Sequence, residues 1–258
     1  MINSIHHKPV PERNPSIECL QEALSSATAS EQRMRQLLAD ASHELRTPLT
    51  VLRGASQMLI RRPSLDQPEV DAALTAINKE ATRLSRLVDD LLSLSRLDAG
   101  QPLHPLPVAL SRFLEDFTAC YTPAWPERTI TLDRSTLNGA QVYVDPEALT
   151  RILINLVENA ARYSTAGKPI LIRGEVVGGA VSIQVQDQGP GLSPEDARRV
   201  FERFYRGSKS RSQRSGGSGL GLAIVRALVG QSRGEIHLDT GPDRGTTFAI
   251  TLPRSRST

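Results

Sequence analysis

A nucleophile, a base and a hydroxyl occur within five residues of this chain, at His43, Glu44 and Thr47. A neutral imidazole is a nucleophile, and an adjacent carboxylate can orient it and accept its proton. In a helix, Thr47 lies one turn after His43 on the same face. Pro48 lacks the amide that would bond the carbonyl of Glu44, so the helix is weakened just after the histidine. A lone histidine on a helix usually has no chemical role, but this combination predicts a reactive imidazole.

The residues around this segment predict the helix that presents it. Apolar residues recur at three- and four-residue steps, at Met34, Leu38, Ala41, Leu45, Leu49 and Leu52. This pattern indicates one stripe of an amphipathic helix, which we expect over residues 30–62, after a helical connector over 17–29. At about 100° per residue, His43 lies nearly opposite the stripe, in solvent and accessible to a partner.

A second amphipathic helix is predicted to end at Gly100, which suits a C-terminal cap. Pro63 and Pro68 interrupt the first helix, and apolar residues then recur at helical spacing over 70–94. Residues 30–100 therefore predict a helical hairpin with one apolar face, and pairing two copies into a four-helix bundle would bury that face. The alternative is a hairpin that packs on the second domain of its own chain. We favour the homodimer.

The rest of the chain predicts a domain of mixed α and β structure. A proline-rich linker over 101–107 precedes this domain, which we expect over 108–253. Helices are predicted over 110–121, 146–162 and 220–229, and strands over 128–132, 141–144, 168–177, 180–186, 235–238 and 246–252. This order favours an α/β sandwich with helices on one face of a mixed sheet.

Size and composition set further limits. At 258 residues the chain can form two domains, and 39% hydrophobic with 23% charged residues is typical of a globular protein. Cys19 and Cys120 match no metal-binding or redox spacing, which indicates a reducing compartment. No apolar run approaches 18 residues, so we expect no membrane span. Residues 1–16 are expected to be a disordered tail, and residues 254–258 a second tail.

Two asparagines lie on one face of the predicted helix over 146–162, at Asn155 and Asn159. A neutral amide oxygen suits one position of an octahedral Mg²⁺ ion whose other ligands are phosphates and water. Arg162 and Tyr163 follow, and they supply a charge for phosphate and a flat surface near a nucleotide. Asparagines in helices are commonly only solvated, so this segment is evidence only together with the motifs that follow.

Glycine-rich segments occur at predicted strand and helix ends. Asp187 ends a strand, where its carboxylate can accept a hydrogen bond from an adenine amino group, and Gly189 and Gly191 let the backbone approach the base. A second such segment opens the helix over 220–229, where free amides favour phosphate. It contains Gly217, Gly219, Leu220 and Gly221.

The segment between these two sites has paired aromatics and a basic, flexible composition. Phe201, Phe204 and Tyr205 can anchor a movable segment, and residues 208–218 have the composition of a lid over phosphates. Much of the net charge of +3 gathers at Arg203, Arg206, Lys209, Arg211 and Arg214. A bound polyphosphate explains this cluster as well as nucleic acid would, and no nucleic-acid-binding motif is present.

Taken in order, these segments resemble the motifs of the sensor histidine kinases of two-component systems. The matching boxes are the H box at 42–49, the N box at 151–163, the G1 box at 187–191, the F box at 201–205, the G2 box at 217–222 and the G3 box at 245–248. One glycine motif is easily matched by chance, but six motifs in order are not.

The resemblance implies an enzyme that uses ATP and Mg²⁺. It makes His43 the phosphoacceptor, Glu44 the general base, and Thr47 the residue that positions water for the reverse, phosphatase activity. It implies a homodimer, an aspartate of a response regulator as partner, and a cytoplasmic location, either alone or as the cytoplasmic part of a membrane sensor. The site residues it implies are Asn155, Asn159 as magnesium ligand, Arg162, Tyr163, Asp187, Gly189, Gly191, Phe204, Arg206, Gly217, Gly219, Leu220, Gly221 and Thr246.

The alternative is an ATP-driven conformational clamp, like the gyrase- and chaperone-type ATPases that share this fold. Those proteins resemble one another in having a glutamate four residues before the magnesium asparagine, where it activates water. Here Asn155 occupies that position, and an amide cannot act as a general base. Attack by water is therefore poorly supported, which preserves the γ-phosphate for His43.

Overall fold

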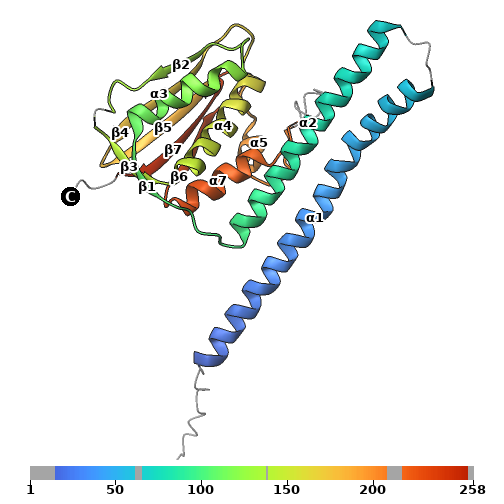
Figure 1. Cartoon of the computed structure of the whole chain (residues 1–258). Helices are drawn as coiled ribbons and strands as arrows, with labels where there is room; N and C mark the ends of the chain where they lie inside the picture. The colour runs from blue at the N-terminus through green and yellow to red at the C-terminus, as the bar shows by residue number, and fades with distance from the viewer. Residues whose placement is uncertain (1–14, 62–65, 138, 208–216, 255–258) are drawn as a thin grey trace, which may run out of the picture. The chain divides into compact units, whose positions relative to one another are not determined.

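The computed structural model describes residues 15–61, 66–137, 139–207 and 217–254 (Figure 1). The chain divides between His43 and Glu44 into two compact units. The predicted disordered tail falls mostly outside the described residues, as do most of the predicted lid and the last residues of the second tail.

A single long helix carries the histidine segment. Helix α1 (Pro15–Arg61) joins the expected connector and the expected first helix without a break. Pro48 lies inside α1, so the predicted weakening does not end the helix. Loss of one amide removes one hydrogen bond, and the neighbouring turns remain bonded. In addition, the Thr50 side-chain hydroxyl donates to the Arg46 carbonyl at 2.9 Å.

The second helix has clear signals at both ends. Helix α2 (Gln67–Asp98) begins after Asp66, whose side chain accepts a hydrogen bond from the Glu69 amide at 3.0 Å. Gly100 follows the helix with φ of 67°, and its amide bonds the Leu97 carbonyl at 3.1 Å. The predicted glycine cap is therefore confirmed.

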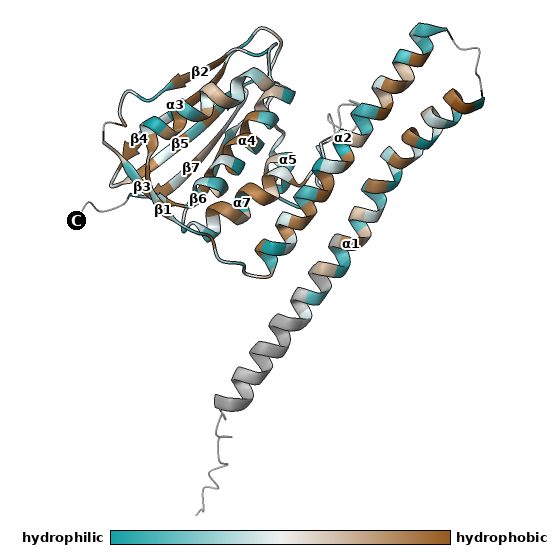
Figure 2. Cartoon of the chain, viewed as in Figure 1, coloured by the Kyte–Doolittle hydropathy of each residue, from teal (hydrophilic) through white to brown (hydrophobic). Residues whose placement is uncertain are grey.

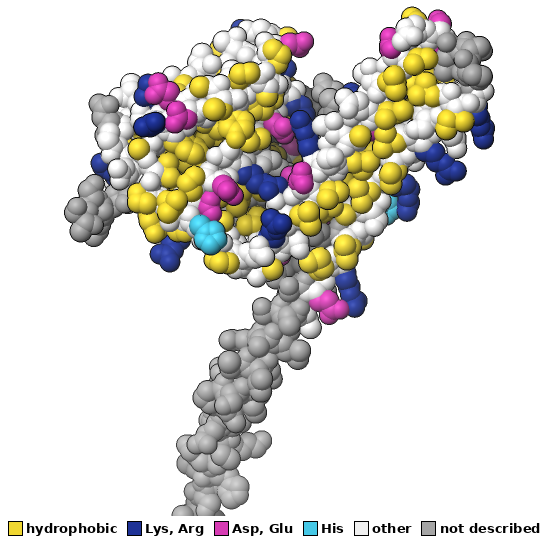
Figure 3. Space-filling model, in the orientation of Figure 1, with side chains coloured by type: hydrophobic (Ala, Val, Ile, Leu, Met, Phe, Trp, Pro, Cys, Tyr) yellow, Lys and Arg dark blue, Asp and Glu magenta, His cyan; other side chains and the backbone are white. Residues whose placement is uncertain are grey.

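Both helices leave apolar side chains in solvent within one chain. Ala73, Leu87 and Leu94 of α2 are buried. Figure 3 shows hydrophobic side chains along the hairpin surface. From Glu44 onward, the large ones that remain exposed on the two helices are Leu49, Val51, Met58, Ile60, Leu74, Val88 and Leu92.

A mixed five-stranded sheet forms the framework of the remaining residues. Its strands are β2 (Ile130–Asp133), β4 (Ile170–Val177), β5 (Ala180–Asp187), β6 (Glu235–Thr240) and β7 (Thr246–Pro253). The order is β2-β4-β5-β7-β6, with β2 parallel to β4 and the other pairs antiparallel. A separate antiparallel pair joins β1 (Leu106–Ala109) to β3 (Gln141–Val144).

Helices cover one face of this sheet, as predicted. Figure 1 shows α3 (Leu110–Tyr121), α4 (Pro146–Tyr163) and α7 (Gly221–Gln231) on the same side of the strands. Figure 2 shows α7 as largely apolar, and alternate residues of β7 are buried. The core lies between α4, α7 and the sheet, where Leu149, Leu156, Ile172, Ile183 and Ile224 are fully buried.

Three elements were not predicted, and the first of them is the short 3-10 helix η1 (Thr122–Ala124) that follows α3. Strand β1 begins at Leu106, so the expected linker over 101–107 ends in a strand that pairs with β3. Helix α5 (Pro194–Arg199) is only six residues long, and its start is capped by the Ser193 hydroxyl. Among the described residues, no helix is both long and apolar enough to cross a membrane.

Candidate functional site

A cavity of about 790 Å³ opens where α4, the end of β5 and the start of α7 meet. Most of the residues predicted to form a nucleotide site line it. These are Asn155, Asn159, Arg162, Tyr163, Asp187, Gly191, Arg206, Gly217, Gly219, Gly221 and Thr246. Gly189, Phe204 and Leu220 do not line the cavity. Gly189 and Phe204 contact residues that do line it, and Leu220 is buried in the core.

Asp187 is the buried acid of the site. It ends β5, its side chain is only 3% exposed, and the pairing of β5 with β7 puts it opposite Thr246. The Gly189 amide donates to its Oδ1 at 2.8 Å. Burial raises the pKa of the Asp187 carboxyl, against the lowering effect of hydrogen bonds from the Gly189 and Thr246 amides. A buried acceptor facing a cavity suits a ligand that brings a hydrogen-bond donor.

The glycines around Asp187 permit close packing between backbone segments. A Cβ on Gly189 would lie 2.4 Å from the Tyr163 carbonyl oxygen. Gly191 has φ of 63°, and a Cβ there would lie 1.8 Å from the Gly241 carbonyl oxygen. Both glycines therefore lie against neighbouring backbone, and that they let the backbone approach a base stays a prediction. Gly191 lines the cavity, and Gly189 packs behind Asp187.

The two asparagines of α4 differ in their surroundings. The Asn155 amide donates to the Arg151 carbonyl at 2.9 Å, and a Cβ on Gly221 would lie 2.5 Å from Asn155 Oδ1. Asn155 therefore packs α4 against the start of α7. Within the described part of the chain, no hydrogen bond to the Asn159 side chain is found, which leaves its amide to face the cavity.

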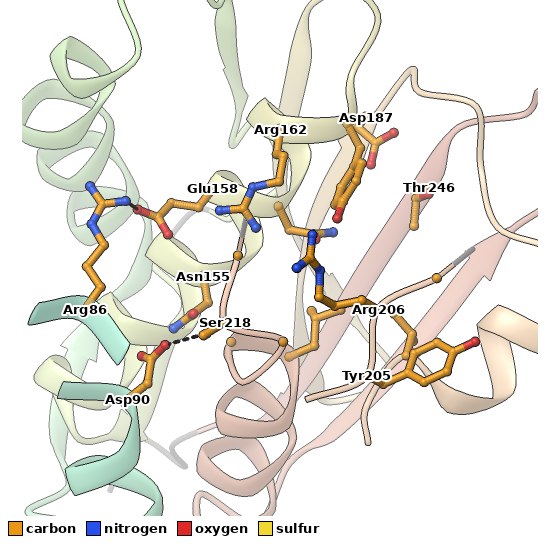
Figure 4. Close-up of a pocket in the computed structure, with 18 of the residues that line it drawn as sticks. Arg86, Asp90, Asn155, Glu158, Arg162, Asp187, Tyr205, Arg206, Ser218 and Thr246 are labelled. Carbon is orange, nitrogen blue, oxygen red and sulfur yellow. Dashed lines mark hydrogen bonds and ion pairs between the residues drawn. The ribbon is translucent and has the colours of Figure 1, made fainter. Parts of the chain in front are cut away.

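Two arginines line the cavity. Figure 4 shows Arg162 on α4 and Arg206 beyond the F segment, both with the guanidinium directed inward. Gly217 packs on Arg162, since a Cβ there would lie 2.0 Å from Arg162 Nη1. Two cations and the amino end of α7 make this part of the cavity suited to an anion.

Phe204 and Leu220 do not line the cavity and instead pack beside residues that do. Phe204 has φ of 58°, and its amide donates to the Gly219 carbonyl at 2.9 Å. Gly219 has φ of 72°, and a Cβ on it would lie 2.8 Å from the Phe204 backbone. Leu220 is fully buried in the core. The contacts between Phe204 and Gly219 fix the G2 box (217–222) against the F box (201–205).

Charged residues of α2 also line the cavity, and the sequence did not indicate them. Figure 4 shows Arg86 paired with Glu158 at 3.3 Å and Asp90 bonded by the Ser218 hydroxyl at 2.9 Å. Burial raises the pKa of Asp90, opposed by its contacts with Ser218 and Arg151. Helical spacing places such residues on the polar side of α2, but only tertiary contacts show which of them meet the site.

The histidine segment lies on α1. His43 and Thr47 are exposed, as predicted, and Glu44 is half-buried beside Arg83 of α2, with 3.4 Å between Glu44 Oε2 and Arg83 Nη2. Among the described residues, no group of three His, Cys, Asp or Glu side chains gathers into a metal site. The Asn159 amide is nevertheless a suitable single ligand for a magnesium ion that phosphates also hold.

Two family models match the chain. Residues 16–100 match the His Kinase A (phospho-acceptor) domain. Residues 144–256 match the histidine kinase-, DNA gyrase B- and HSP90-like ATPase. The first model covers the helical hairpin, and the second covers α4, β5, β7 and α7, which carry most of the residues around Asp187.

Individual proteins agree with these models. The chain is 39% identical over 260 residues to the probable sensor histidine kinase TcrY of Mycobacterium tuberculosis, covering 95% of this chain and 54% of that protein. Histidine kinase AdeS of Acinetobacter baumannii superposes with a TM-score of 0.64 at 28% identity, over 83% of this chain and 98% of that one.

A third similarity concerns the fold alone. Histidine kinase ThkA, solved in complex with the response regulator protein TrrA, superposes with a TM-score of 0.70 at 22% identity, over 90% of this chain and 66% of that one. The chain spans about half the length of the curated relatives it matches.

Proposed function

This chain belongs to the sensor histidine kinases of two-component systems, and on that premise we propose that it phosphorylates itself on His43 with ATP and passes the phosphoryl group to an aspartate of a response regulator. The observation that carries the proposal is the cavity around Asp187. It combines a buried acceptor, an amide ligand and two cations, in a chain that also presents an exposed histidine beside a carboxylate.

The cavity has polar groups suited to the adenine and to the phosphates of the nucleotide. Asp187 would accept a hydrogen bond from the adenine amino group, because it is buried and its known partners are backbone amides. Arg162, Arg206 and the amino end of α7 would hold the phosphates. Asn159 would supply one oxygen to Mg²⁺, which when bound neutralises phosphate charge.

The transfer itself needs positioning more than covalent chemistry by the protein. One imidazole nitrogen of His43 forms a bond to the γ-phosphorus, the bond to the bridging oxygen breaks, and ADP leaves with that electron pair. Glu44 takes the proton from the other ring nitrogen, so that the ring returns to neutrality. ATP as substrate places the reaction in the cytoplasm.

Two partners follow from the family and from the surface of the hairpin. The exposed apolar side chains of α1 and α2 would be covered by a second copy of the chain. A response regulator would dock near His43, as TrrA forms a complex with ThkA. On the same helix face, Thr47 would hold a water against the regulator's aspartyl phosphate in the reverse activity.

The clamp-type ATPase remains the contrasting function. Its water-activating base would have to stand at Asn155, but the Asn155 amide donates to the Arg151 carbonyl and packs on Gly221. Among the relatives named above, both sequence similarity and structural similarity lead to histidine kinases.

The proposal is tested by incubating the whole chain with Mg²⁺ and γ-labelled ATP. We expect a protein-bound label that is stable to base, labile to acid and absent from His43→Gln. Adding response regulators should move the label to the cognate regulator. Rapid phosphate release with no protein-bound label would instead support the clamp.

A further inference from the structure

An ion-pair cluster joins the two helices next to the histidine. Arg83 of α2 lies between two carboxylates: its Nη2 is 3.4 Å from Oε2 of Glu44, and its Nη1 is 3.6 Å from Oε2 of Glu80. The side chains of Arg83, Glu44 and Glu80 are 23%, 29% and 16% exposed. All three are thus shielded from solvent more than ordinary surface ion pairs, which makes their geometry better defined.

The cluster holds two carboxylates and one cation. Glu80 lies three residues before Arg83, so both belong to one face of α2, while Glu44 belongs to α1. Glu80 Oε2 is buried, and no hydrogen-bond partner for it is found in the described part of the chain. Its attraction to Arg83 is therefore purely one of charge, and it draws one arm of the guanidinium towards α2. A guanidinium has separate nitrogens for two partners, which a lysine lacks.

We propose that Arg83, anchored by Glu80, is a positioning residue for the reaction of His43. The inference rests on the proposed function, in which Glu44 accepts the imidazole proton. Arg83 contacts Oε2 of Glu44, which holds the carboxylate in one rotamer and leaves Oε1 for the imidazole. As one ring nitrogen of His43 bonds to the γ-phosphorus and ADP departs, the proton on the other nitrogen passes to Oε1. A fixed base reduces the reorganisation that this step requires.

Arg83 also lines the cavity around Asp187, so a second role must be separated from the first. If Arg83 bound nucleotide phosphates, its loss would raise the KM for ATP. If it positions Glu44, its loss lowers kcat and leaves KM almost unchanged, because Glu44 is engaged in the transfer and not in ATP binding. The two roles are therefore distinguished by which constant changes: KM for ATP if Arg83 binds phosphates, and kcat if it positions Glu44.

The test compares Arg83→Gln, Arg83→Lys and Glu80→Gln in the whole chain, by the rate of label incorporation into His43. We expect Arg83→Gln to lower kcat by about ten-fold with KM for ATP within about two-fold, as for one lost positioning contact. Arg83→Lys should recover part of the rate, and Glu80→Gln should lose a few-fold. Arg96→Gln, on an exposed arginine of the same helix, should match wild type.

A double-mutant cycle with Glu44→Gln separates positioning from general damage to the helices. In the Glu44→Gln background, Arg83→Gln should change the remaining rate by less than about two-fold, because the residue it acts through is gone. Equal losses in both backgrounds, or a raised KM at unchanged kcat, would overturn the inference. Absence of any label in the wild-type chain would instead contradict the proposed function, which keeps the two failures distinct.

Discussion

At the scale of single residues, the site depends on groups whose burial is unfavourable for folding. Asp187 is almost fully buried at the end of β5, and burial raises the pKa of its carboxyl. A carboxyl with a raised folded-state pKa favours folding only while it is protonated. That contribution is lost as pH rises through the folded-state pKa, so an ionised Asp187 is less favourable for folding than a neutral one.

We therefore predict that Asp187→Asn separates binding from stability. The amide keeps an oxygen for the Gly189 amide but can turn a donor towards the adenine amino group, so ATP affinity should fall by about ten-fold or more. Without nucleotide, the variant should melt at the same or a higher temperature than wild type at pH 7. This difference should shrink as pH falls from 7 towards the ordinary pKa of an aspartate, because burial raises the folded-state pKa of Asp187 and the wild-type carboxyl is protonated first in the folded chain.

Calorimetric titration with ATP and thermal unfolding across this pH range measure both quantities. A variant that binds ATP as tightly as wild type would contradict the assignment of Asp187 to adenine. A variant that melts well below wild type at pH 7 would show that the carboxylate stabilises the fold.

At the scale of elements, the start of α7 is held by a backbone contact that only glycine allows. Gly219 has φ of 72°, in the left-handed region, and lies against the backbone of Phe204. A side chain there meets both strain, of about 1–2 kcal/mol, and a backbone that cannot rotate away. The F box and the G2 box should therefore move together.

We predict that Gly219→Ala lowers both thermal stability and ATP affinity, because Phe204 and the amino end of α7 are displaced from the cavity. Gly230→Ala, inside α7, is the control, because a Cβ there would meet no atom within 4 Å. Alanine in that helical position should stabilise by roughly 0.5–1 kcal/mol and leave ATP binding unchanged. Thermal unfolding and ATP titration of both variants measure these effects. Equal melting temperatures and ATP affinities for the two variants would contradict the proposed backbone contact between Gly219 and Phe204.

At the scale of the whole molecule, the hairpin leaves several large apolar side chains exposed within one chain. Leu74 and Val88 of α2 are 51% and 44% exposed, and Ile60 of α1 is 78% exposed. Figure 3 shows hydrophobic side chains gathered along the surface of the hairpin, and such gathering is typical of an interaction surface. A second copy of the hairpin is the partner that the family implies for this surface.

We accordingly predict that the chain is a dimer in solution and that Leu74→Glu with Val88→Glu makes it monomeric. Both side chains are exposed within one chain, so the charges should disturb association and leave the fold of the chain intact. Val177→Glu, at an equally exposed position on β4, should stay dimeric. Light scattering measures the oligomeric state of each variant, and circular dichroism checks that its fold is intact. A wild-type monomer, or a dimer that tolerates both glutamates, would refute the predicted interface.

Much of this molecule could be predicted from local patterns. The bounds expected for α3 and β3 agree with the structure, and those of α4, β5 and β7 agree to within a residue or two. These elements have long periodic apolar patterns and clear end signals, such as Pro146 at the start of α4 and Gly178-Gly179 between β4 and β5. Strand β1 was missed because Pro105 and Pro107 indicate a linker, and its pairing with β3 is a contact between segments far apart in the sequence.

The sequence by itself determined the chemistry of this protein: an exposed histidine beside a carboxylate, and an ordered series of polar and glycine motifs. Residue type and local spacing are sufficient for that, because side-chain chemistry and helical periodicity act over a few residues. Only the tertiary structure decided where each of those residues lies and which groups it contacts. It placed Asn155 against α7 and left Asn159 facing the cavity, set Leu220 in the core, and brought Arg83 to Glu44. Such assignments depend on which segments meet across long stretches of chain, and a one-dimensional pattern does not specify those contacts.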